Sequence, residues 1–120
     1  MVFSVADAMA NSNRDWIVDS GATSCMTGHI ENLVDVHMLD EPRPRTVASG
    51  ETMLATSVGK ALLLRDGYEV CVMQDVLYVK GLALNLVSVE AVSHNGMEIS
   101  FKGVSCVIRS ENGMTLEASR

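Results

Sequence analysis

An aspartate directly after an apolar segment is the residue in this chain best placed to do chemistry. The segment Trp16–Val18 is aromatic and β-branched, as expected of a buried strand, and Asp19 follows it. The next residues are Ser20, Gly21, Ala22 and Thr23. Because they are small and two carry hydroxyls, they allow a tight turn whose side chains can bond backbone or carboxylate. Such a turn would present a catalytic carboxylate, although an isolated Asp-Ser-Gly is more often a surface turn started by its aspartate.

The aspartate needs other elements to position it. Residues 1–15 are rich in small and polar types without periodicity, so we expect a flexible leader. Residues 28–40 have a mixed apolar pattern that fits a short helix, a loop or a strand. Pro42 and Pro44 are expected to prevent regular structure across residues 41–45.

Paired β-prone segments predict two hairpins in the middle of the chain. Residues 46–48 and 52–58 flank a tip formed by Ser49-Gly50-Glu51. An Asp-Gly turn separates residues 60–64 from residues 68–79. These segments make β structure the main component of the fold.

The last third of the chain predicts one helix followed by strands. Apolar residues recur at helical spacing, which favours a helix over 85–94 that stops at Asn95-Gly96. Residues 97–101 alternate like a strand, and residues 104–108 and 114–116 flank a final turn. The expected fold is therefore mostly β with one short helix.

Composition indicates one small domain and argues against some partners. The chain has 120 residues, and only 4% of them are aromatic, so aliphatic residues and methionine must fill the core. A dimer interface would add burial that such a core lacks. The net charge of −6 disfavours nucleic-acid binding, which needs a basic patch. No apolar run is long enough to cross a membrane and no signal peptide is evident, so we expect an intracellular, cytoplasmic protein without a membrane partner.

The cysteines and histidines do not follow a metal-binding pattern. The chain has three cysteines, Cys25, Cys71 and Cys106. Their odd number and the lack of Cys-x-x-Cys spacing favour reduced thiols over disulfides or zinc. The histidines are His29, His37 and His94, whose spacings match no ligand motif. We therefore expect neither a metal nor another cofactor.

The aspartate segment carries a resemblance to a known family. Asp19–Thr23 resembles the active-site loop of retropepsins, the aspartic proteases of retroviruses and retrotransposons. Trp16–Thr27, together with Asp75–Leu82 and Asn85–Val89, resembles the protease region of copia-type retrotransposon polyproteins. The similarity runs over residues 16–101. It divides the chain into a leader (1–15), a retropepsin-like protease domain (16–101) and a C-terminal extension (102–120), which is expected to form a β-hairpin.

The resemblance implies a closed β fold whose active site lies between two identical chains. The sequence agrees in one respect, because Asp-Ser-Gly occurs only once. Two neighbouring Asp19 carboxylates would share one proton, as the catalytic pair of aspartic proteases does, because like charges at close range cannot both ionise cheaply. In the family's terms Ser20 would bond the carboxylate, Gly21 would keep the turn open, and the Thr23 hydroxyl would hold the loop through a backbone group.

Two further segments acquire roles from the same resemblance. The hairpin tip Ala48, Ser49, Gly50 and Glu51 would be a flap that closes over a peptide, although an ordinary surface hairpin has the same pattern. Leu86, Val87 and Ser88 match a motif that packs behind the active loop, or equally a plain core helix. The chain departs from copia-type sequences at Cys25, where histidine is common, and at Lys80, where proline is common, and both changes bear on pocket shape.

The predicted function is an aspartic endopeptidase that works as a homodimer on a polypeptide, the parent polyprotein, and associates with virus-like particles by family resemblance. The alternative is a catalytically weak dimerisation or peptide-binding module with the same fold. A serine or cysteine hydrolase that uses Ser20 or Cys25 is disfavoured because the chain has no nucleophile-elbow pattern.

Overall fold

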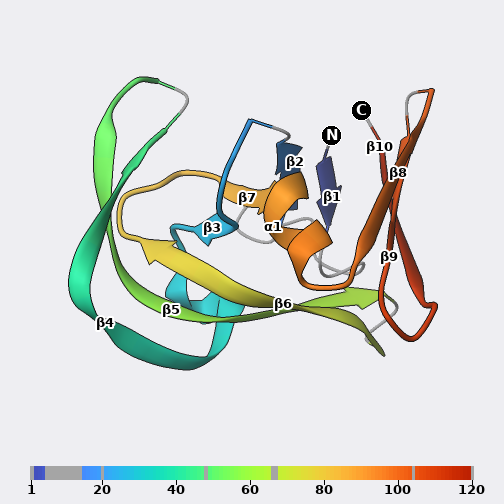
Figure 1. Ribbon diagram of the computed structural model, residues 1–120, viewed down its shortest axis with the longest axis horizontal. Coiled ribbons are helices and arrows are strands. Elements are labelled where there is room, and N and C mark those ends of the chain that lie inside the picture. The colour runs from blue at the N-terminus through green and yellow to red at the C-terminus, as the bar shows by residue number, and fades with distance from the viewer. Residues whose placement is uncertain are drawn as a thin grey trace.

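Strands account for most of the molecule, and they form one continuous sheet that curls around a short helix (Figure 1). This computed structural model describes residues 2–4, 15–19, 21–47, 49–65, 68–103 and 105–119. Within them the strands are β1 Val2–Ser4, β2 Asp15–Asp19, β3 Met26–Thr27, β4 Leu33–Thr46, β5 Thr52–Arg65, β6 Tyr68–Val79, β7 Asn85–Ser88, β8 Glu98–Lys102, β9 Ser105–Arg109 and β10 Thr115–Ser119. Their order across the sheet is β4-β5-β6-β3-β7-β2-β1-β10-β9-β8. The expected fold class, mostly β with one short helix, is confirmed.

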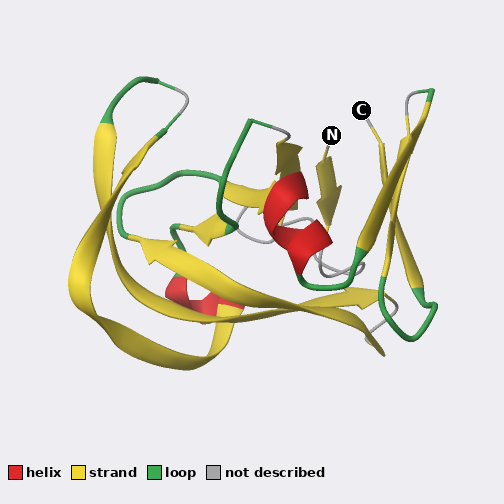
Figure 2. Ribbon diagram, in the orientation of Figure 1, coloured by secondary structure: helices red, strands yellow, loops and turns green. Residues whose placement is uncertain are grey.

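The helical part of the described chain consists of the helix α1 (Val89–His94) and one 3₁₀ turn at Ile30–Asn32 (Figure 2). The side chain of Ser88 caps α1 by accepting a hydrogen bond from the backbone of Ala91 at 3.0 Å. The helix ends before Gly96, whose φ of +81° suits a glycine after a helix C-terminus. No helix of the described residues is long and apolar enough to span a membrane.

Three long antiparallel strands, β4, β5 and β6, form the largest part of the sheet. Both predicted hairpins occur here, with longer arms than the sequence indicated. The β4–β5 tip closes through a hydrogen bond from the Val47 N–H to the Glu51 oxygen at 2.9 Å. At this tip Gly50 has a φ of +86°, which glycine adopts at little cost. Register shifts along both pairings add bulges, and bulges increase the local bend and twist of strands.

The expectation that Pro42 and Pro44 prevent regular structure was wrong. Strand β4 runs through both prolines, and Pro44 is registered opposite Leu54 of β5. Two features explain this tolerance. The strand is at the edge of the sheet, where a residue without an N–H loses no ladder bond on its outer side, and the register shifts between Met38 and Arg43.

The predicted helix over 85–94 was half wrong, because its first four residues form β7. All four side chains of β7 are buried, and the strand lies between β2 and β3. It runs parallel to β2, with Trp16 opposite Asn85 and Asp19 opposite Ser88. A strand buried on both faces shows no alternation of apolar and polar residues, so its pattern resembles that of a buried helix.

The first and last described strands meet in the sheet. Residues 2–4 form β1, which pairs with β2 and meets β10 at Val2 and Ser119. Residues 5–14 of the predicted flexible leader lie outside the described residues. Strands β9 and β10 form a hairpin, and β8 pairs with β9 on its other side. The N- and C-terminal strands are therefore neighbours in one sheet (Figure 1).

Two groups of buried side chains make up the core of the described residues. The larger group surrounds Trp16 and Val92, and the smaller surrounds Leu77 and Leu86. Apart from Trp16, the fully buried members are aliphatic, methionine and cysteine side chains, which agrees with the low aromatic content. Each fully buried large side chain contributes about 1.5–3 kcal/mol through removal of apolar surface from water.

Candidate active site

The strand that carries Asp19 is held on both sides. Strand β2 pairs with β1 and with β7, and its residues Trp16 and Val18 are buried in the core. Asp19 is the last residue of the strand and is half-buried. The core therefore fixes the backbone before the aspartate, while the carboxylate remains accessible.

The aspartate begins a tight turn, as its sequence context indicated. Its Oδ1 accepts a hydrogen bond from the Gly21 N–H at 2.8 Å, and its backbone oxygen accepts one from Ala22 at 3.3 Å. A Cβ added at Gly21 would lie 3.3 Å from the same Oδ1, so a glycine leaves the carboxylate room. The surface-turn interpretation is thus correct for local geometry. Ser20 lies outside the described residues, so its expected bond to the carboxylate stays a prediction.

The loop after Asp19 is held from behind by the end of β7. The fully buried Ser88 donates its hydroxyl to the Ala22 oxygen at 2.8 Å, and its backbone N–H lies 3.3 Å from the Cys25 sulfur. The same hydroxyl accepts the capping bond from Ala91. Leu86, Val87 and Ser88 are therefore placed directly behind the loop, and one serine ties the loop to both a strand and a helix.

Thr23 is exposed at the surface of the aspartate loop, and its expected loop-holding bond stays a prediction. Within the single chain, the Ser88 hydroxyl supplies a bond to the loop. The Thr23 hydroxyl is left at the surface, accessible to another molecule.

A pocket of about 500 Å³ connects the aspartate loop with the stem of the β4–β5 hairpin. Its lining residues are Asp19, Gly21, Ala22, Thr23, Met26, Arg45, Thr46, Val47 and Leu86. Asp19 is the one acidic side chain among these described residues. Ser49, Gly50 and Glu51 are exposed and do not line the pocket, and Ala48 lies outside the described residues. The stem of the predicted flap, not its tip, contributes to the pocket in this conformation.

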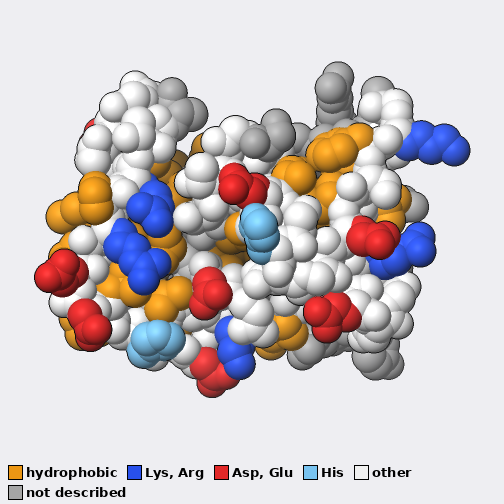
Figure 3. All heavy atoms as spheres, viewed as in Figure 1, with side chains coloured by type: hydrophobic (Ala, Val, Ile, Leu, Met, Phe, Trp, Pro, Cys, Tyr) orange, Lys and Arg blue, Asp and Glu red, His pale blue; other side chains and the backbone are white. Residues whose placement is uncertain are grey.

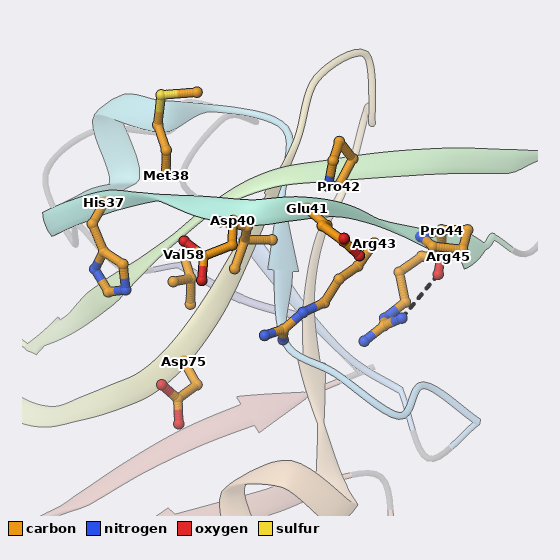
Figure 4. Close-up of a pocket in the computed structure, with 11 residues that line it drawn as sticks. His37, Met38, Asp40, Glu41, Pro42, Arg43, Pro44, Arg45, Val58 and Asp75 are labelled. Atoms are coloured by element: carbon orange, nitrogen blue, oxygen red, sulfur yellow. Dashed lines mark hydrogen bonds between the residues drawn. The ribbon is translucent and has the colours of Figure 1, made fainter.

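A larger pocket of about 960 Å³ lies along β4, away from Asp19 (Figure 4). Residues His37 to Arg45 form most of its wall, and Val58 and Asp75 complete it. We place the candidate active site in the smaller pocket because that pocket contains the strand-end carboxylate. Arg45 lines both pockets, so the two openings adjoin at this side chain.

The environment of Cys25 disfavours thiol chemistry. Cys25 is a free, buried cysteine, and burial raises the pKa of its thiol from an ordinary value of 9.0 to about 11, opposed in part by the hydrogen bond from the Ser88 backbone. A nucleophilic cysteine needs a lowered pKa and access to substrate. Cys106 is likewise buried, whereas the side chain of Cys71 lies outside what the structure describes.

The histidines are spread over separate elements. His29 lies 3.7 Å from the Glu31 carboxylate, and His37 and His94 are exposed on β4 and α1. In the described part of the chain, no group of three histidine, cysteine or acidic side chains is arranged to hold a metal ion.

Sequence reasoning missed a buried polar cluster beneath the site. The Thr27 hydroxyl donates to the Asn85 Oδ1 at 2.5 Å, and the Asn32 amide donates to both side-chain oxygens at 3.3 Å. These bonds connect β3, β7 and the 3₁₀ turn next to Met26 and Leu86, which line the pocket. Asparagine inside an apolar run was the available signal, because a buried amide requires partners.

The molecule is thus a small, mostly β domain. Asp19 lies at the end of β2, which pairs in parallel with β7, and it lines a pocket together with the stem of the β4–β5 hairpin. Residues 16–97 match the family described as "Pol polyprotein, beta-barrel domain". Because this match covers more than half of the chain, the chain belongs to that family, which supports an origin in a retroelement Pol polyprotein. No solved structure matches the chain significantly.

Proposed function

We propose that this domain is a copia-type aspartic endopeptidase, in which two copies of the chain bring two Asp19 carboxylates together to cleave a polypeptide. The observation that carries the proposal is the way in which the loop after Asp19 is held. Asp19 ends a strand fixed by parallel pairing to β7, its turn is tied to Ser88, and its carboxylate faces the pocket under the hairpin stem. This is the presentation that a general acid–base carboxylate requires.

The chemistry needs a second carboxylate, which a second chain would supply. Asp-Ser-Gly occurs once in the sequence, and Asp19 is the one acid among the described residues that line its pocket. In a pair that shares a proton, the charged carboxylate activates a water and the protonated one donates to the peptide carbonyl oxygen. This step uses no covalent intermediate, metal or other cofactor. The exposed Thr23 lines the same pocket as Asp19.

The β4–β5 hairpin would act as the flap. Its stem residues Thr46 and Val47 line the pocket, and its tip carries Gly50 in open space, where no atom would meet an added Cβ within 4 Å. Closure of such a hairpin over an extended peptide excludes water and adds main-chain hydrogen bonds. The proposed substrate is the parent polyprotein within the cell.

The decisive variant is Asp19→Asn, which the structure makes a clean test. The asparagine Oδ1 can still accept the Gly21 N–H bond, so the turn is retained while the acid is lost. We expect the wild-type dimer to cleave an unstructured polyprotein-derived peptide at pH 5–7, with specific activity that rises with protein concentration. The variant should be inactive, with light scattering showing the same dimer. Equal cleavage by both proteins, or no cleavage by a confirmed wild-type dimer, would refute the proposal.

The alternative is a non-catalytic dimerisation or peptide-binding module. One observation favours it, namely that the Asp19 Oδ1 is already engaged by the backbone of its own turn. Binding of a polyprotein peptide without turnover, unaffected by Asp19→Asn, would support the module.

A further inference from the structure

Two arginines project from the same side of β4 near the candidate active site. Arg43 and Arg45 are two positions apart, and residues so spaced share one face of a strand. Figure 4 shows both guanidinium groups on the side of β4 where Asp75 lies, whereas Met38 points to the other side. Lys and Arg side chains also gather beside β4 in the space-filling view (Figure 3). The protein carries net negative charge, and the larger pocket that contains both arginines also contains Asp40, Glu41 and Asp75.

Arg45 has unused hydrogen-bonding capacity at the edge of the active-site pocket. Its Nη1 donates to the neighbouring Pro44 oxygen at 2.8 Å, but its Nε is buried and makes no hydrogen bond with the described residues. The ion pairs found in the described chain are His29 with Glu31 and Lys60 with Asp35, so neither arginine of β4 is neutralised by one of them. A buried donor without an acceptor is unfavourable, and a carboxylate is the acceptor that a guanidinium binds best.

The pockets around these arginines adjoin one another along β4. Arg45 lines both the pocket of Asp19 and the larger pocket, and Arg43 lines the larger pocket and a third one of about 240 Å³. This third pocket reaches Thr23 and Ser24 of the aspartate loop. A peptide lying extended along β4 from Asp19 would therefore pass Arg45 first, with same-face side chains recurring about every 7 Å.

Within the proposed protease, on which this inference rests, we infer that Arg45 selects substrates with an acidic side chain close to the scissile bond. A glutamate or aspartate carboxylate would accept bonds from the part of the guanidinium that lines the pocket, and Arg43 would add favourable charge. A twofold dimer presents Arg45 twice, once on each side of the two aspartates. The preferred substrate is therefore acidic at matching positions on both sides of the cleaved bond.

Acidic residues near β4 do not replace such a substrate group. Asp40, Glu41 and Asp75 line the larger pocket with Arg43 and Arg45, and none of them is in the ion pairs found among the described residues. None of the three lines the pocket that contains Asp19 and Arg45. Of the two arginines, Arg45 is the one that lines the pocket of Asp19.

Binding to the Asp19→Asn dimer tests this selectivity without turnover. The probes are two fluorescent peptides of the same length, one with glutamate and one with glutamine at the positions flanking the central bond, compared by anisotropy. We expect the glutamate peptide to bind about ten- to a hundredfold tighter, the range for hydrogen bonds to a charged group. Arg45→Gln should abolish the difference, and Arg45→Glu should reverse it, so that the glutamate peptide binds more weakly than the glutamine peptide. Arg109→Gln, which removes an exposed arginine of β9, is the matched control and should leave the difference intact.

The outcomes separate this inference from the proposed protease activity. Equal binding of both peptides, no binding of either, or discrimination that survives Arg45→Gln would overturn it. Wild-type cleavage is scored separately with the same two peptides. Cleavage without discrimination between the peptides would refute the role of Arg45 and support the protease. Arg45-dependent discrimination without cleavage would support the role of Arg45 in binding and refute the protease.

Discussion

Ser88→Ala removes the hydroxyl that joins the aspartate loop to the rest of the fold. The Ser88 side chain makes two bonds, one donated to the Ala22 oxygen at 2.8 Å and one accepted from the Ala91 N–H at 3.0 Å. The first fixes the loop after Asp19, and the second caps α1. The substitution removes one oxygen atom and leaves the buried backbone bond to the Cys25 sulfur in place.

The expected loss of stability follows from these two bonds. Removal of a serine cap costs about 1 kcal/mol, and loss of an intramolecular hydrogen bond costs about 1 kcal/mol more. The fully buried Ser88 site and the half-buried Ala22 allow little water to replace the lost partners. We therefore expect the free energy of unfolding to fall by about 2 kcal/mol.

Urea denaturation at one fixed protein concentration measures this change, because dimerisation would make stability concentration-dependent. With a typical urea dependence of about 1–3 kcal/mol per molar, the midpoint should fall by roughly 0.7–2 M. Ser93→Ala is the matched control, since Ser93 is exposed on the same helix and its hydroxyl bonds the Val89 oxygen within that helix. The control should lie within about 0.5 kcal/mol of wild type.

The reasoning would be refuted if the two serine variants had the same midpoint. It would also be refuted if Ser88→Ala were destabilised but left the loop unchanged, as judged by an unaltered backbone chemical shift at Ala22. Either result would mean that the bonds of Ser88 do not hold the loop.

Three further outcomes are expected. Gly28→Ala should prevent normal folding, because its Cβ would lie 1.7 Å from the Leu82 backbone oxygen. Gly113→Ala is the control, since it is strained only by a φ of +88° and should cost about 1–2 kcal/mol of stability. Similar melting temperatures of the two variants would contradict this. The Cys25 thiol should resist alkylation at pH 8 until the protein unfolds. Because its folded pKa of about 11 exceeds its ordinary value of 9.0, stability should be full below pH 9 and fall by about 2–3 kcal/mol towards pH 11, and Cys25→Ala should lack that fall. Gly21→Ala should lower turnover more than stability, since its Cβ would crowd the Asp19 carboxylate; unchanged turnover would argue against this.

The sequence was a good guide wherever local chemistry decides the structure. The hairpin tip at Gly50, the turn begun by Asp19 and the helix stop before Gly96 depend on neighbouring residues only, and each has the expected geometry. The strand before Asp19 was equally evident from its β-branched and aromatic residues. Pairing of the loop with Leu86, Val87 and Ser88 was expected from family resemblance and not from the pattern itself.

Features that depend on distant parts of the chain were not predictable in this way. Strand β7 has the pattern of a buried helix until its position between β2 and β3 is known. Pro42 and Pro44 fit a strand only because β4 is at the sheet edge. That Arg45 and Asp19 line one pocket depends on the course of the long β4–β5 hairpin relative to the loop, which no short segment specifies.

The tie between the aspartate loop and β7 also affects when the site can form during synthesis. The hydroxyl bond from Ser88 to Ala22 joins residues 66 positions apart, and β2 has no β7 neighbour until that later segment has been made. Contacts so far apart in sequence form late, after the cost of closing a long loop has been met. A nascent chain that ends before Ser88 can form the local turn at Asp19 but lacks the bond and the strand that fix its loop, so the order of translation delays assembly of the site until β7 has been made.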